Sequence, residues 1–180
     1  MYAHAKRLLD GGTSPIVIFA HHDEVLRPLA AAFADDGLAV RLISGSLKTQ
    51  RDRYDIVVSF AEGKIDVLLA TFLTSREGLT LTRASHALIA ERSWAPAYEL
   101  QCEDRIYRIG QLHDCCITYF HAPGTVDEYF LRLVHDKDKR CAELFAHQLT
   151  RHDAALCCAV ESDDGRIAAS TPRLSNATFE

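Results

Sequence analysis

Residues 101–111 read Gln-Cys-Glu-Asp-Arg-Ile-Tyr-Arg-Ile-Gly-Gln. If this segment is helical, Gln101, Arg105 and Arg108 are spaced by four and three residues, so they lie on one side of the helix. Gly110 is then expected to end the helix as a left-handed cap. A face that carries two arginines and a glutamine is suited to binding a phosphate group.

A structural alternative exists for the same stretch. The two arginines could form an exposed basic face that pairs with Glu103 and Asp104 on the neighbouring arc of the helix. Spacing alone does not decide between a phosphate site and such a solvated face.

Short apolar runs alternate with segments of helical periodicity along most of the chain. Continuous apolar runs are typical of strands that are buried in a parallel sheet. Predicted strands span 15–20, 39–43, 66–71, 86–90 and 115–121, and predicted helices span 3–9, 23–36, 49–62, 97–109 and a segment after Thr125. This alternation predicts an α/β fold with a doubly wound, mostly parallel sheet flanked by helices.

Two of these helices carry more detailed expectations. In the helix at 49–62, the residues expected to face inward are Tyr54, Val57, Val58 and Ala61. In the last helix, Thr125 is the expected N-cap and Glu128 completes a capping box. The domain is expected to span 14–149, after an N-terminal helix or linker at 1–13 and before a flexible polar tail at 150–180.

Composition sets broad limits. The chain has 180 residues, is 48% hydrophobic and carries a formal net charge of −5, which disfavours a protein that coats nucleic acid but permits a local basic groove. No apolar run reaches the roughly 20 residues of a membrane helix, and no signal-peptide pattern opens the sequence. The six cysteines include two adjacent pairs and no Cys-x-x-Cys, so free thiols in a reducing compartment are expected rather than a metal site.

The loops after the predicted strands are the places where ligands gather in an open parallel sheet. At the first loop, Asp23 is expected to be the N-cap of the next helix rather than part of a metal or acid–base cluster with His21 and His22. At the second, residues 44–46 read Ser-Gly-Ser and could hold a nucleic-acid phosphate or simply turn the chain. Thr71, at the third, is open to the same two interpretations.

Several motifs together resemble a known family. Residues 101–111 fill the pattern Gln-x-x-x-Arg-x-x-Arg-x-Gly-Gln, and a Trp-x-Pro stands before them at 94–96. Residues 77–82 read Glu-Gly-Leu-Thr-Leu-Thr, and residues 124–128 read Gly-Thr-Val-Asp-Glu. From about Ser14 to Phe145 the chain is similar to the second RecA-like lobe of superfamily-two, Swi/Snf-type DNA translocases, and is most similar to their annealing-helicase, fork-remodelling branch.

The resemblance implies a role for each matching residue. It implies that Arg108 is an arginine finger for the terminal phosphate of ATP, that Arg105 supports the same charge, and that Gln101, Gly78 and Glu77 belong to the ATP-binding edge. It places Ser44, Gly45, Thr71 and Thr74 on the DNA track. The implied cofactor is ATP with Mg²⁺, bound mainly by a first lobe, and the implied partners are that lobe and double-stranded or forked DNA. The implied location is intracellular, cytoplasmic in a prokaryote or nuclear in a eukaryote.

This chain also departs from the family pattern. The fifth motif usually carries two glycines and an asparagine, where this chain has Ser75-Arg76 and Thr80, and Tyr107 stands in place of a histidine. No Gly-x-x-x-x-Gly-Lys-Ser/Thr loop occurs in the sequence, so we do not expect this chain alone to hydrolyse ATP. It could be a fragment, a split subunit or a gene remnant.

The competing interpretation is a stand-alone module that docks DNA or protein without ATP. A dinucleotide-dependent enzyme is disfavoured because no Gly-x-Gly-x-x-Gly follows a strand.

Overall fold

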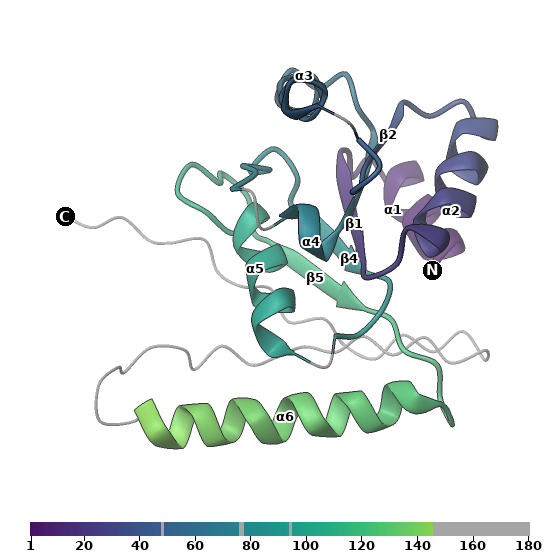
Figure 1. The fold of residues 1–180 in the computed structure, drawn as a ribbon. Coiled ribbons are helices and arrows are strands. Elements are labelled where there is room, and N and C mark those ends of the chain that lie inside the picture. Colours follow the sequence, from purple (N-terminus) through teal and green to yellow (C-terminus); the bar gives the residue numbers. More distant parts are fainter. Residues whose placement is uncertain (48, 76–77, 94, 146–180) are drawn as a thin grey trace.

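A computed structural model describes residues 1–47, 49–75, 78–93 and 95–145 (Figure 1). Its centre is a five-stranded sheet with the order β2-β3-β1-β4-β5, and every strand pair is parallel. The strands are β1 (Ile16–Ala20), β2 (Val40–Ile43), β3 (Val67–Thr71), β4 (His86–Ile89) and β5 (Cys116–Tyr119). The predicted fold class and all five predicted strands are confirmed, each within two residues of its predicted ends.

The helices cover both faces of the sheet. They are α1 (Tyr2–Asp10), α2 (Asp23–Asp35), α3 (Gln50–Ala61), the single turn α4 (Phe72–Ser75), α5 (Pro96–Ile106) and α6 (Val126–Phe145). Side chains alternate along the central strand β1, so Ile16 and Ile18 pack under α1 and α2 while Val17 and Phe19 pack under α3 and α5. Figure 1 shows α1 and α2 together on one side of the sheet, with α6 running below α5.

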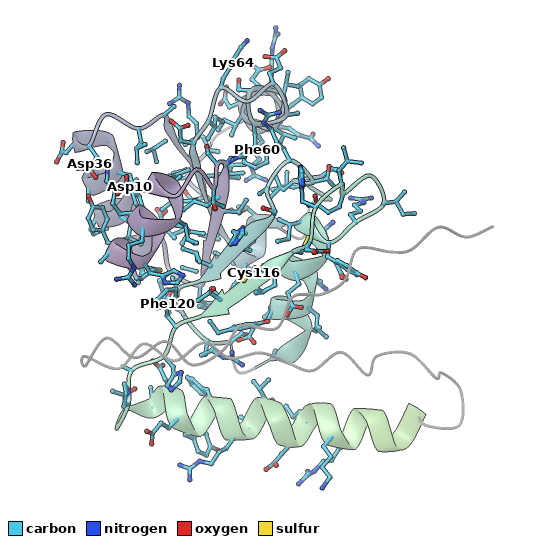
Figure 2. The ribbon with its side chains drawn as sticks, turned by 180° about the vertical axis from the view of Figure 1, so that it is seen from behind. Asp10, Asp36, Phe60, Lys64, Cys116 and Phe120 are labelled. Atoms are coloured by element: carbon cyan, nitrogen blue, oxygen red, sulfur yellow. The ribbon has the colours of Figure 1, made fainter. Side chains whose placement is uncertain are left out.

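The N-terminal helix α1 is docked on the same core as the sheet. Its Ala5 is fully buried. Asp36, labelled in Figure 2, lies just after α2. It accepts a hydrogen bond from Tyr2 and pairs with Lys6 at 2.9 Å. The tail predicted at 150–180 lies outside the described residues.

The predicted inward face of α3 is right for Val57 and wrong for Tyr54 and Ala61. Tyr54 is 68% exposed and Ala61 is also exposed, whereas Phe60 is fully buried. The helix packs through Ile56, Val57 and Phe60, a set rotated by about one residue from the predicted face. On a helix with this weak amphipathic pattern, one large aromatic residue decides which side turns inward.

The predicted end of α5 is also wrong. The helix ends at Ile106, and Tyr107 leaves the helical region with φ −85° and ψ 79°. The carbonyl of Arg105 accepts the N–H of Leu81, and the carbonyl of Ile106 accepts the side-chain amide of Gln111. Tertiary donors therefore take the last carbonyls, and the helix stops before Arg108.

Gly110 consequently does not cap α5. Its φ of 101° belongs to a later turn, which is closed by the hydrogen bond from Gln111 N to Arg108 O. Arg108 thus lies beyond the helix and does not share a helical face with Gln101 and Arg105.

The last helix begins as expected. Thr125 Oγ1 accepts the N–H of Asp127 at 3.2 Å, and Glu128 Oε1 accepts the N–H of Gly124 at 3.0 Å. The capping residues are those predicted, although Glu128 reaches one residue further back than in a standard capping box.

Candidate functional site

Two segments that are far apart in sequence meet beside the C-terminal end of α5. We call residues 78–84 together with residues 105–111 the junction. Its backbone tie is the hydrogen bond from Leu81 N to Arg105 O, at 2.9 Å. Gln111 adds a second tie, because its Nε2 donates to Ala84 O at 2.8 Å and to Ile106 O at 3.1 Å. The structure therefore joins the two stretches that the sequence singled out.

Arg108 projects from the junction into solvent. Its Nη1 donates to Thr80 Oγ1 at 3.0 Å, and both residues are exposed. Within the described part of the chain, no carboxylate pairs with this guanidinium. Most of its N–H groups therefore remain available to an anion.

Arg105 and Gln101 lie one helical turn apart on α5, as predicted. Both are half-buried, and Arg105 Nε and Gln101 Oε1 are each buried without a hydrogen-bond partner among the described residues. Buried polar atoms normally have partners, so this pair is under-satisfied in the chain as it stands.

Gly78 lies at the start of the junction with a φ of 77°, which only glycine adopts without strain. Glu77, also predicted at the ATP-binding edge, lies outside the described residues, as does Trp94.

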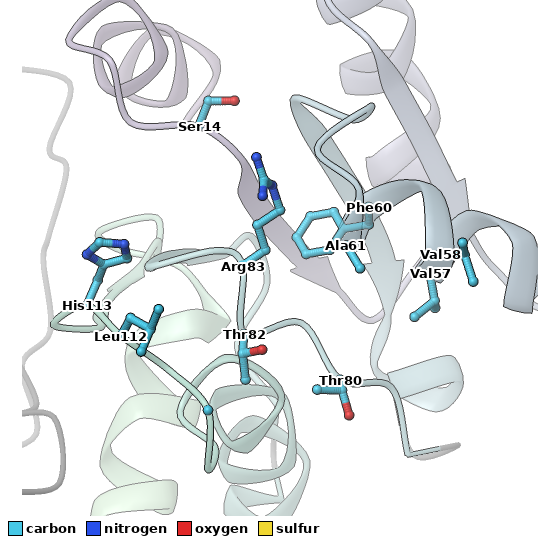
Figure 3. Close-up of a pocket in the computed structure, with 11 residues that line it drawn as sticks. Ser14, Val57, Val58, Phe60, Ala61, Thr80, Thr82, Arg83, Leu112 and His113 are labelled. Carbon is cyan, nitrogen blue, oxygen red and sulfur yellow. The ribbon is translucent and has the colours of Figure 1, made fainter.

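A hollow of about 570 Å³ opens next to the junction (Figure 3). Its walls come from α3 and from the loops before β1, β4 and β5, through Ser14, Val57, Val58, Phe60, Ala61, Thr80, Thr82, Arg83, Gly110, Leu112 and His113. Thr80, the partner of Arg108, lies on its rim.

The predicted DNA-track residues gather at the carboxyl edge of the sheet, after β2 and β3. Thr74 Oγ1 lies 3.1 Å from Ile43 O, 2.9 Å from Thr71 O and 3.1 Å from Thr71 Oγ1. Ser44, Thr71 and Thr74 are all at least 94% buried, whereas Gly45 is exposed. The hydroxyl of Thr74 therefore joins the end of β2 to the end of β3, while the hydroxyl of Ser44 bonds to Ser46 within its own turn. The outer surface here belongs to Gly45 and Ser46.

The expectation that Asp23 is an N-cap is wrong. His22 occupies the N-cap position of α2, and Asp23 is the first helical residue, where it pairs with Arg27 one turn later. Glu91, which follows β4, instead accepts the N–H groups of His21 and His22 at 2.9 and 2.8 Å and lies 2.8 Å from His22 Nδ1. This hydrogen bond raises the pKa of His22.

A buried polar cluster under α5 was not predicted. Arg92 pairs with Glu99 at 3.1 Å and lies 4.3 Å from the ring centroid of Tyr119, whose hydroxyl donates to Glu103. Burial raises the pKa of Tyr119. Because Glu103 is only 3% exposed and bonds to Tyr119, it is not part of an exposed ion-paired face. Sequence reasoning missed this cluster because its members come from three separate elements.

The described residues contain no group of three metal-ligating side chains. Cys102, Cys115 and Cys116 form no disulfide among the described residues. Among the helices that the structure describes, none has the length and apolar character to cross a membrane.

Comparison with known proteins gives the same family throughout. The helicase conserved C-terminal domain family matches residues 3–110. The SWI/SNF-related matrix-associated actin-dependent regulator of chromatin subfamily A-like protein 1 of Xenopus tropicalis is 32% identical over 133 residues, which cover 73% of this chain and 14% of the relative. The DNA annealing helicase and endonuclease ZRANB3 of Mus musculus is 31% identical over 135 residues, 74% of this chain and 12% of that protein. The DNA repair protein RAD5 of Eremothecium gossypii is 32% identical over 142 residues, 74% and 13% of the two chains.

Solved structures show the same fold. The C-terminal part of the Fun30 ATPase domain superposes with a TM-score of 0.68 at 24% identity, covering 73% of this chain and 44% of that one. The Pyrococcus furiosus Hef helicase domain superposes with a TM-score of 0.58 at 23% identity, covering 72% and 26%. The chain therefore belongs to the helicase conserved C-terminal domain family, and it shares its fold with these solved helicase and ATPase domains.

Proposed function

We propose that the chain is the second motor lobe of an ATP-dependent double-stranded-DNA translocase. In this proposal Arg108 is the arginine finger, Arg105 supports it, and the carboxyl edge of the sheet forms part of the DNA track. A first lobe with a phosphate-binding loop is needed for hydrolysis. The chain spans only 12–14% of the length of the curated relatives described above, so the activity of the whole protein remains part of the proposal.

The observation that carries this proposal is the exposed guanidinium of Arg108 at the junction, which no carboxylate of the described residues pairs with. A guanidinium fork matches the geometry and charge of phosphoryl oxygens, and a carboxylate partner would neutralise it. The acceptor that does bind it, Thr80 Oγ1, is neutral. An arginine in this state is suited to stabilise charge on a phosphate that a second lobe presents.

The under-satisfied atoms on α5 fit a nucleotide-facing role as well. Arg105 Nε has no acceptor and Gln101 Oε1 has no donor among the described residues, so both gain a partner if a polar ligand approaches this face. ATP with Mg²⁺ would supply the transferable phosphoryl group. This chain would supply positive charge beside that phosphoryl group and would help to orient it.

For DNA, we propose contacts through the turn at Ser44 and Gly45. The hydroxyls of Thr71 and Thr74 already bond within the protein, so their contribution is to hold the turn in shape. Contacts between the protein backbone and DNA phosphates do not depend on the base sequence. They therefore suit a protein that moves along DNA of any sequence. Double-stranded or forked DNA is the proposed partner, and the proposed location is the compartment that holds it.

The test is DNA-stimulated phosphate release by the polypeptide of these 180 residues, with and without an added first lobe. We expect no release from the polypeptide alone and DNA-dependent release once the lobe is added. Robust hydrolysis by the isolated polypeptide would overturn the division of labour between lobes. DNA binding without stimulation by any first lobe would instead favour a docking module.

A further inference from the structure

Among the described residues, the side chain of Arg108 bonds to a residue outside the arginine motif. Thr80 Oγ1 accepts a hydrogen bond from Arg108 Nη1 at 3.0 Å. Among the described residues this is the only hydrogen bond that the Arg108 side chain makes. The guanidinium is therefore in contact with the hydroxyl of Thr80.

The junction is held together by other contacts than the hydrogen bond between Thr80 and Arg108. Leu81 and Ile106 are fully buried beneath the junction, and the bonds from Leu81 N to Arg105 O and from Gln111 Nε2 to Ala84 O join its two segments. Thr80 itself is exposed on the rim of the hollow (Figure 3). Loss of its hydroxyl should therefore change the freedom of Arg108 and leave the fold intact.

A hydroxyl group is suited to restricting the Arg108 side chain. An exposed arginine samples many rotamers, and fixing one of its N–H groups lowers the cost of ordering it later. A neutral acceptor restricts the side chain without cancelling its charge, so the remaining N–H groups keep their attraction for an anion.

We propose that Thr80 is a positioning residue for Arg108, whose hydroxyl pre-orients the guanidinium for the phosphate group it meets at the lobe interface. The inference rests on the proposed function of Arg108. It predicts that the Thr80 hydroxyl acts on turnover rather than on nucleotide affinity, because a finger that engages in the transition state affects kcat more than KM.

The first measurement needs no partner lobe. Heteronuclear NOEs of the Arg108 Nε–H group are recorded by NMR for the full chain and for Thr80→Val, Thr80→Ser and Thr82→Val. Thr82 is a matched control because it lies two residues away and has no hydrogen bond to another described side chain. We expect a lower NOE in Thr80→Val alone, with unchanged melting temperatures. An unchanged NOE in Thr80→Val would overturn the inference.

The second measurement uses the chain together with a first lobe. Thr80→Val should lower kcat about threefold to tenfold, the range expected for one neutral hydrogen bond, while Thr80→Ser and Thr82→Val keep the wild-type rate. The Arg108→Ala variant distinguishes the proposed function of Arg108 from the positioning role of Thr80. Full turnover by Arg108→Ala would refute the proposed function. Loss of turnover in Arg108→Ala, with Thr80→Val as fast as Thr82→Val or faster, would refute the positioning role.

Discussion

Two arginines near α5 show how environment separates a structural cation from an exposed one. The side chain of Arg92 is 1% exposed, paired with Glu99 and held over the Tyr119 ring, so its charge is compensated inside the fold. Arg108 is exposed, and among the described residues its side chain bonds only to a threonine hydroxyl. The first arrangement stabilises the attachment of α5 to β4 and β5, and the second leaves a charge available to a ligand.

Arg92→Ala should destabilise the domain strongly, because it leaves Glu99 buried without its ion-pair partner. Breaking a buried pair on one side costs about 3–5 kcal/mol. Urea unfolding followed by circular dichroism measures this free energy, with the exposed Arg83→Ala as control, expected to change it by less than about 0.5 kcal/mol. An equal, small effect of both substitutions would show that the buried pair contributes little.

The pair formed by His22 and Glu91 should make stability depend on pH. The pKa of His22 is raised by Glu91 above the ordinary value of 6.5, so its contribution is fully present below about 6.5 and is lost as pH rises through the folded-state pKa. His22→Gln should therefore lower the melting temperature more at about pH 5.5 than at about pH 8.5. Because the His22 side chain is 61% exposed, the effect will be small. A difference that grows with pH would contradict this assignment.

Among the elements, the strands could be predicted from sequence and the details of two helices could not. Continuous apolar runs such as β1 and β3 can only be buried between two layers of helices, and the whole of each strand is buried. The end of α5 depends on donors from Leu81 and Gln111, which approach only in the folded chain. Local sequence carries no signal for such a donor.

Gln111 should control how firmly the junction is held. Gln111→Ala leaves the carbonyl of Ala84 without this donor, at a cost of about 1–3 kcal/mol for a buried group, whereas the carbonyl of Ile106 keeps the N–H of Arg108. Hydrogen exchange should speed up at residues 81–84 and 105–111 and stay unchanged in β3. Uniform acceleration across the sheet would mean that Gln111 stabilises the whole domain rather than the junction.

Over the whole molecule, the sequence singled out two stretches that lie together in the fold, but it did not predict the contacts that hold them. The arginine stretch meets the segment after Gly78 at the junction, and Arg108 reaches its position through a turn and not along a helical face. At the carboxyl edge, the hydroxyls of Thr71 and Thr74 turn out to bond to the protein itself. A side chain's partner depends on elements distant in sequence, and one chain's motif pattern does not encode it.

In the proposed function, this chain provides positive charge and a first lobe provides the nucleotide-binding loop. This chain offers positive charge at the junction, and its described residues hold no cluster for a metal ion. A phosphate-binding loop is absent from the sequence, so charge and nucleotide should come together only when a first lobe docks beside Arg108.

The most direct measurement is steady-state phosphate release by Arg108→Ala paired with a first lobe and saturating DNA, with Arg83→Ala as the matched control. We predict that Arg108→Ala lowers turnover by about 10³-fold or more, the typical effect of an arginine finger, while its DNA affinity stays at the wild-type value. Turnover close to that of Arg83→Ala, or a loss of DNA affinity that parallels the loss of turnover, would contradict the assignment of Arg108 as the finger.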